Sequence, residues 1–105
     1  MDALGQLALL QARQSDDANQ RQAAFGRAAD ALGAAWDASP YQTEYGRRLA
    51  LVYEEWAEAM PDEAGRRAHL EEARLALERA RRLAPADVRP RDDLTHITTL
   101  LTESR

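Results

Sequence analysis

The sequence predicts an all-α protein, a short α-solenoid in which five helices form an array of antiparallel helix pairs. Three observations predict this fold class. The 105 residues include 22 Ala and 14 Leu, which favour helices, but only two Val and one Ile, which favour strands. Apolar residues recur at helical spacing along most of the chain. Segments also resemble one another at a fixed offset of 45 residues, which is typical of helical repeat proteins.

Length and composition limit the class of protein further. A chain of this length forms one domain with a modest core, and 45% apolar residues are enough for it despite a formal net charge of −4. The absence of Cys excludes disulfides, thiol catalysis and Cys-ligated zinc. All 14 basic residues are Arg, which is typical of a GC-rich bacterial genome. We therefore expect one soluble domain over residues 1–105.

The first helix is expected over residues 2–14. This segment begins with an acid, Asp2, and has no basic residue before its apolar stretch at 7–10. That stretch is too short for a secretion signal or a membrane span. The sequence therefore predicts a cytoplasmic protein that does not bind a membrane.

Capping residues place the next two helices. The segment 15–17, Ser-Asp-Asp, predicts the start of a helix over 16–38. The segment 39–42, Ser-Pro-Tyr-Gln, is typical of a capping box with Pro at the first helical position. It predicts that a third helix occupies residues 41–59.

Prolines mark the starts of the last two helices. Pro61 and Pro90 are each followed within three residues by two acids, which complement the positive end of a helix dipole. The fourth helix is therefore expected over 62–84 and the fifth over 90–103. The connections are short, so consecutive helices are expected to pack antiparallel.

The internal repeat is carried by apolar, small and Pro positions. At an offset of 45, Leu4 aligns with Leu49 and Pro40 with Pro85, and a partial third copy begins at Leu94. Other aligned pairs are Phe25 with Leu70, Ala28 with Ala73, Leu32 with Leu77, and Ala35 with Ala80. The chain then divides into repeat one at about 1–40, repeat two at about 41–85, and a closing helix at about 90–103.

These positions carry a resemblance to a known family. The spacing Ala28-x3-Leu32-x2-Ala35-x4-Pro40, and its copy Ala73-x3-Leu77-x2-Ala80-x4-Pro85, is similar to the second helix of a tetratricopeptide repeat (TPR). Leu49-Ala50-x2-Tyr53 resembles the Leu-Gly-x2-Tyr pattern of the first helix in that family. The resemblance implies a single TPR-like domain over the whole chain.

The chain departs from the family in two respects. Gly46 stands where the first helix of the family has Trp, and the period is 45 residues where the family has 34. The difference is about three helical turns, so both helices of each pair would lengthen together. HEAT-like helix pairs remain an alternative to lengthened TPR repeats.

The resemblance implies a binding scaffold. First helices of TPR repeats line a concave groove that accepts a peptide or helix of a partner protein. Carried onto this chain, the groove residues are Gln6, Leu9, Arg13, Glu44, Arg47, Leu51, Glu54, Glu55, Glu58, Asp92 and His96. The acids at 54, 55 and 58 favour a basic or amphipathic partner. The alternative is that they form the solvated face of their helix.

A homo-oligomer is the alternative function. Leu10, Leu75 and Leu100 fall outside the main apolar stripes of their helices, and we expect them to be exposed. Isolated exposed leucines are common. Two repeats are, however, short for a stable array, and self-association through these leucines would bury more apolar surface.

Other function classes are not expected. Residues 61–105 contain nine Arg but also nine acids, so they lack the net positive charge that nucleic-acid binding needs. His69 and His96 have no metal-ligand spacing, and the chain has no phosphate loop or nucleophile motif. We expect Trp36 and Trp56 in the core. The sequence therefore predicts no enzyme, no cofactor, no metal and no nucleic-acid partner.

Overall fold

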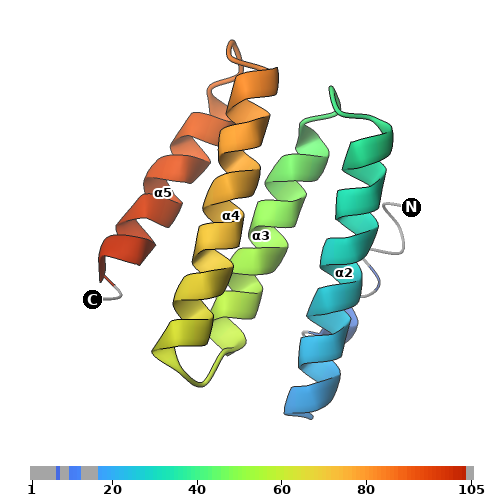
Figure 1. Ribbon diagram of the computed structural model, residues 1–105, viewed down its shortest axis with the longest axis vertical. Helices are drawn as coiled ribbons and strands as arrows, with labels where there is room; N and C mark the ends of the chain where they lie inside the picture. The colour runs from blue at the N-terminus through green and yellow to red at the C-terminus, as the bar shows by residue number, and fades with distance from the viewer. Residues whose placement is uncertain (1–6, 8–9, 13–16, 104–105) are drawn as a thin grey trace.

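The computed structural model describes residues 7, 10–12 and 17–103, and these residues form helices and connections without a strand (Figure 1). The helices are α2 (Ala18–Ala38), α3 (Glu44–Ala59), α4 (Glu63–Leu83) and α5 (Arg89–Glu103). Residues 7 and 10–12 are also helical, and the rest of the first expected helix lies outside the described residues. The all-α prediction is confirmed. Among the described helices, none combines the length and the apolar character that a membrane span requires.

The helices lie side by side in chain order. α3 packs against α2 and α4, and α5 packs against α4 with a smaller contact to α3. Consecutive helices run antiparallel and α2 and α5 form the two edges (Figure 1). α3 and α5 both run antiparallel to α4, so they run in the same direction, and they also contact each other.

The helix ends recur at the 45-residue offset found in the sequence. α4 begins and ends 45 residues after α2, and α5 begins 45 residues after α3. The N-caps Asp17 and Asp62 are also 45 residues apart, and the carboxylate of each accepts backbone N–H groups of the first turn. The C-caps Ser39 and Ala84 share nearly the same backbone angles, φ/ψ of −141°/70° and −138°/70°. Both long helices therefore begin with an Asp N-cap and end with a C-cap of the same backbone conformation.

The prediction of a capping box at Ser39 is wrong. Ser39 ends α2, and its N–H donates to the carbonyls of Ala35 and Trp36. The indole N–H of Trp36 donates to the Pro40 carbonyl at 3.0 Å, which holds Pro40 in the connection. As a result α3 begins at Glu44, three residues later than expected.

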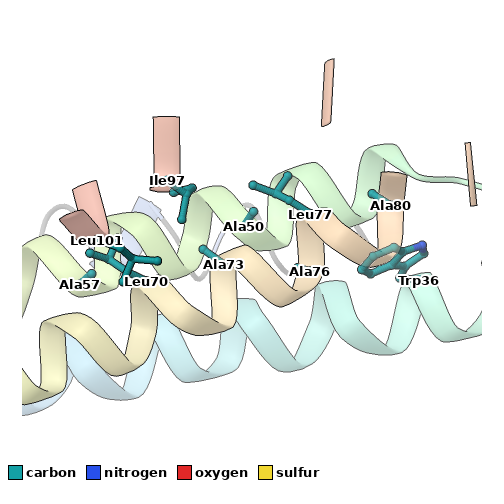
Figure 2. Close-up of a cluster of buried hydrophobic side chains, with 10 residues drawn as sticks. All are labelled: Trp36, Ala50, Ala57, Leu70, Ala73, Ala76, Leu77, Ala80, Ile97 and Leu101. Carbon is teal, nitrogen blue, oxygen red and sulfur yellow. The ribbon is translucent and has the colours of Figure 1, made fainter. Parts of the chain in front are cut away.

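The core consists of two clusters. The larger one joins all four described helices and contains Trp36, Ala50, Ala57, Leu70, Ala73, Ala76, Leu77, Ala80, Ile97 and Leu101 (Figure 2). The smaller one joins α2, α3 and Ala12, and contains Ala24, Phe25, Ala28, Ala29, Leu32 and Val52. Alanines in the middle of each stripe let the helix axes approach closely. Trp36 is fully buried, and Trp56 packs partly buried against the smaller cluster, so both belong to the core as expected.

Trp36 joins three helices. A Cβ atom at Gly46 of α3 would lie 2.5 Å from the indole ring, so the ring fits only because residue 46 is Gly. On α4, the guanidinium of Arg79 lies 4.0 Å from the centre of the same ring, a cation–π contact. Arg79 also forms an ion pair of 3.3 Å with Asp37 of α2. The indole therefore sets how closely α2 and α3 approach.

We expect Gly46→Ala to lower the free energy of unfolding by about 1–3 kcal/mol, because the added methyl overpacks the indole. Gly33→Ala is the matched control: its Cβ would meet nothing within 4 Å. The free energy of unfolding of the Gly33→Ala variant should rise by about 0.5–1 kcal/mol, because Ala has a better helix propensity than Gly. Urea denaturation followed by circular dichroism measures both changes. A gain in stability in both variants would contradict the role of the Trp36–Gly46 contact.

Candidate interaction groove

α3 and α5 enclose a hollow of about 190 Å³, which we call the α3–α5 groove. Its floor is apolar and consists of Ala50 from α3, Leu77 from α4 and Ile97 from α5, all buried. Its walls consist of Glu44, Arg47, Arg48, Leu51 and Glu54 from α3 and of Asp93 and His96 from α5. The groove thus combines an apolar floor with charged walls.

Two polar pairs bridge the groove from α3 to α5. Arg47 binds the Asp93 carboxylate with two nitrogens, Nε at 2.7 Å and a terminal nitrogen at 3.4 Å. This hydrogen bond raises the pKa of Arg47. His96 Nε2 lies 2.7 Å from Glu54 Oε1. Partly exposed pairs of this kind contribute only about 0–1 kcal/mol each, so a ligand can replace them at little cost.

A third bridge closes one end of the groove. Arg89 at the start of α5 lies 3.5 Å from the Glu44 carboxylate of α3. The same guanidinium binds Asp87 at 2.7 Å, and this hydrogen bond lowers the pKa of the Asp87 carboxyl to about 2. The Asp87 carboxylate also accepts the backbone N–H of Arg89 at 3.0 Å, which explains why α5 begins at residue 89.

Leu51 is the apolar residue that the groove leaves open to solvent. Its exposed fraction is 46%, although it lies beside a floor of three buried apolar residues. An apolar side chain of a ligand could cover Leu51 and the floor together. The burial of that surface would supply the hydrophobic part of a binding energy.

The structure brings together five of the expected groove residues, namely Glu44, Arg47, Leu51, Glu54 and His96. Glu55 and Glu58 lie further along α3 and do not line the groove; Glu55 is half-buried and Glu58 exposed. The side chain of Asp92 is 70% exposed and lies 3.9 Å from Arg91. Gln6, Leu9 and Arg13 lie outside the described residues.

Sequence reasoning missed Asp93, which contacts Arg47, and placed its neighbour Asp92 in the groove. Asp93 lies one helical turn before the buried Ile97, so its position at the edge of the apolar stripe was a usable signal. Asp92 lies one turn before His96, and that spacing alone does not decide which of the two acids faces α3.

The leucines assigned to self-association differ in exposure. Leu10 is 46% exposed and Leu75 is 50% exposed, as expected. Leu100 is not exposed as expected: it is half-buried and packs against the larger core cluster. Its place next to the buried Leu101 brings it to the edge of the α4–α5 contact.

A second cluster of chemically distinctive side chains lies near the α3–α4 connection. The indole of Trp56 stacks on His69, with ring centres 4.0 Å apart, and Phe25 and Tyr53 stack around it at about 6 Å. Trp56 also donates its indole N–H to Gln22. Burial lowers the pKa of His69 and raises that of Tyr53. We interpret the cluster as part of the core.

No cluster of three or more His, Asp or Glu in the described part of the chain is arranged to hold a metal ion. Comparison with family models, curated proteins and solved structures finds no match for this chain. The resemblance to the TPR family therefore depends on the residue pattern alone.

The aromatic cluster makes stability depend on pH. Because the folded state lowers the pKa of His69, the unfolded state binds the proton more readily, and stability falls as the pH drops below about 6.5. Urea denaturation between about pH 7.5 and pH 5.5 measures this loss. His69→Phe keeps a stacking ring that does not titrate, so its loss should be smaller. An equal loss in both proteins would contradict the assignment to His69.

Proposed function

We propose that this protein is a non-enzymatic interaction module whose α3–α5 groove binds a peptide or a helix of a partner protein. The observation that carries this proposal is the half-exposed Leu51 beside the buried floor of Ala50, Leu77 and Ile97. The charged pairs of the walls surround this apolar centre. An apolar centre with a polar rim is typical of protein interfaces.

The charges of the groove favour an amphipathic partner with a basic residue. Glu54 lies at the groove wall, and its carboxylate is engaged by the partly exposed His96. Glu58, which is exposed one turn after Glu54 on α3, adds a carboxylate beyond the groove lining. An aliphatic side chain of the partner would cover Leu51, and an Arg or Lys about one turn away would bind Glu54 in place of His96.

The arrangement of helices supports a lengthened TPR-like array. In that family the first helices of adjacent repeats line the groove, and here the two helices that line it, α3 and α5, begin 45 residues apart. The identical offset of α2 and α4 is consistent with a repeating helix pair. HEAT-like pairs remain the alternative family.

We expect Leu51→Glu to weaken the binding of groove ligands, because it places a carboxylate over the apolar floor. Peptides selected from a random phage-displayed library on the immobilised protein supply the ligands. Their affinities for the variant should fall about tenfold or more. Leu75→Glu is the matched control, since Leu75 is equally exposed but lies on α4 outside the groove.

Glu54→Gln should weaken only those selected peptides that carry Arg or Lys. Peptides that bind Leu51→Glu as tightly as the original protein would place the binding site elsewhere and contradict the proposal. Selected sequences without any apolar residue would contradict it as well, because the floor would then have no role.

Self-association is the second candidate function, favoured by the exposure of Leu75 and Leu10. If it occurs, light scattering over about a hundredfold range of concentration should give a mass that rises above 11.7 kDa. Leu75→Glu should then restore a constant mass, and Leu51→Glu should not. A constant mass in the unmodified protein would reject this candidate and leave the groove open to a partner.

A further inference from the structure

A second hollow, of about 390 Å³, lies between α4 and α5, and we call it the α4–α5 hollow. Its lining consists of Arg74, Glu78, Arg81, Arg91, Leu94, Thr95, Thr98 and Thr99. An adjoining hollow of similar volume shares Glu78 and Arg81 and adds Arg82 and Pro85. No residue of the α3–α5 groove lines either one.

The 45-residue offset shows which internal surface corresponds to this hollow. Four of its lining residues, Arg81, Arg91, Thr95 and Thr98, correspond to Trp36, Gly46, Ala50 and Tyr53. Trp36 and Ala50 share the larger core cluster with the buried face of α4 (Figure 2). Tyr53 packs against that cluster. The corresponding surface between α2 and α3 is therefore where a helix, α4, docks.

At these four positions the lining of the hollow is polar where the corresponding surface is mainly apolar, although α4 and the start of α5 keep the 45-residue offset. The pair of an indole and a glycine at Trp36 and Gly46 becomes two arginines, Arg81 and Arg91. The hydroxyls of Thr95 and Thr99 donate to carbonyls one turn earlier in α5, at 3.2 and 2.9 Å. Since those donors are used within the helix, Arg81, Arg91 and the hydroxyl of Thr98 are the donors of this lining that can bind a ligand.

The charge of the two hollows is positive in a protein whose net charge is −4. Four arginines and one carboxylate, Glu78, line them, and Arg74 binds that carboxylate at 2.6 Å. Arg81 and Arg82 form no ion pair with a carboxylate of the described residues, and Arg91 lies 3.9 Å from Asp92. Cations that line one hollow repel each other, and an anion placed between them removes that repulsion.

We propose that the α4–α5 hollow docks an acidic amphipathic helix of a partner protein, in the position where a further helix of the array would lie. The half-buried Leu94 offers an apolar contact at its floor. Carboxylates of the partner bind Arg81 and Arg91. A helix with an apolar face, like the face of α4 that packs against α3, does not fit this polar lining. It would bury the guanidinium groups of the hollow without a partner, which is unfavourable.

The probe for the test is a fluorescein-labelled helical peptide about as long as α5, 15 residues, with Leu on one face and Glu on the flanking positions. A second peptide carries Gln at every Glu position. In fluorescence anisotropy the Glu peptide should bind at least about tenfold more tightly than the Gln peptide, because charge-assisted hydrogen bonds are the stronger ones.

The double variant Arg81→Gln/Arg91→Gln should lose about tenfold or more in affinity for the Glu peptide. The double variant Arg27→Gln/Arg66→Gln removes the same charge from exposed positions on α2 and α4 outside both hollows, and should bind like the original protein. The Leu51→Glu variant should also bind the Glu peptide with unchanged affinity. This result would separate the α4–α5 hollow from the α3–α5 groove. Circular dichroism melts verify the fold, and the single variants Arg81→Gln and Arg91→Gln replace the double one should it unfold.

Three results would overturn the proposal. Equal affinities of the Glu and Gln peptides would show that the carboxylates of the peptide do not contribute to binding. An equal loss of affinity in the Arg27→Gln/Arg66→Gln variant would show that the net charge of the protein, and not the α4–α5 hollow, binds the Glu peptide. Tighter binding of a single-stranded oligothymidine, lost in the Arg81→Gln/Arg91→Gln variant, would assign the hollow to nucleic acid instead of a helix.

Discussion

The close contact between the indole of Trp36 and the backbone at Gly46 positions α2 against α3, and the same ring contacts α4. The ring fills the space that any larger residue at 46 would need, binds the Pro40 carbonyl through its N–H, and carries the guanidinium of Arg79 on α4. One side chain thereby sets the spacing of α2 and α3, the path of their connection and a contact to α4. Arg47, the next residue of α3, lies in the wall of the groove, so this contact lies directly beside the candidate site.

Most of the fold could be predicted from local signals. Alanine and leucine content and helical spacing identify the helices, and the acids Asp17 and Asp62 mark two of their starts within a residue or two. The start of α3 could not be predicted in this way. Ser39 and Pro40 fit the end of one helix as well as the beginning of the next. The hydrogen bond from the indole of Trp36 to the Pro40 carbonyl decides between these two possibilities. This bond comes from a buried side chain one turn earlier, so the local pattern does not reveal it.

The candidate groove was predictable to the extent that it depends on α3 alone. Glu44, Arg47, Leu51 and Glu54 are spaced by three and four residues, so they share one face of any helix that contains them. Asp93 and the α4–α5 hollow depend on how α5 is rotated on α4, which follows from the packing of Ile97 and Leu101 and is not contained in a single helix. The partly buried Leu100 was misjudged for the same reason.

The ion pairs across the groove also make the contact between α3 and α5 depend on ionic strength. α5 shares the larger core cluster with α4 and α3, and two ion pairs, Arg47 with Asp93 and Arg89 with Glu44, join it to α3 at the groove. Salt screens partly exposed charges over distances of about 8–10 Å and leaves apolar packing intact. Rising salt therefore weakens the attachment of α5 to α3 at the ion pairs Arg47–Asp93 and Arg89–Glu44, while the packing of Ile97 and Leu101 in the core keeps α5 in place.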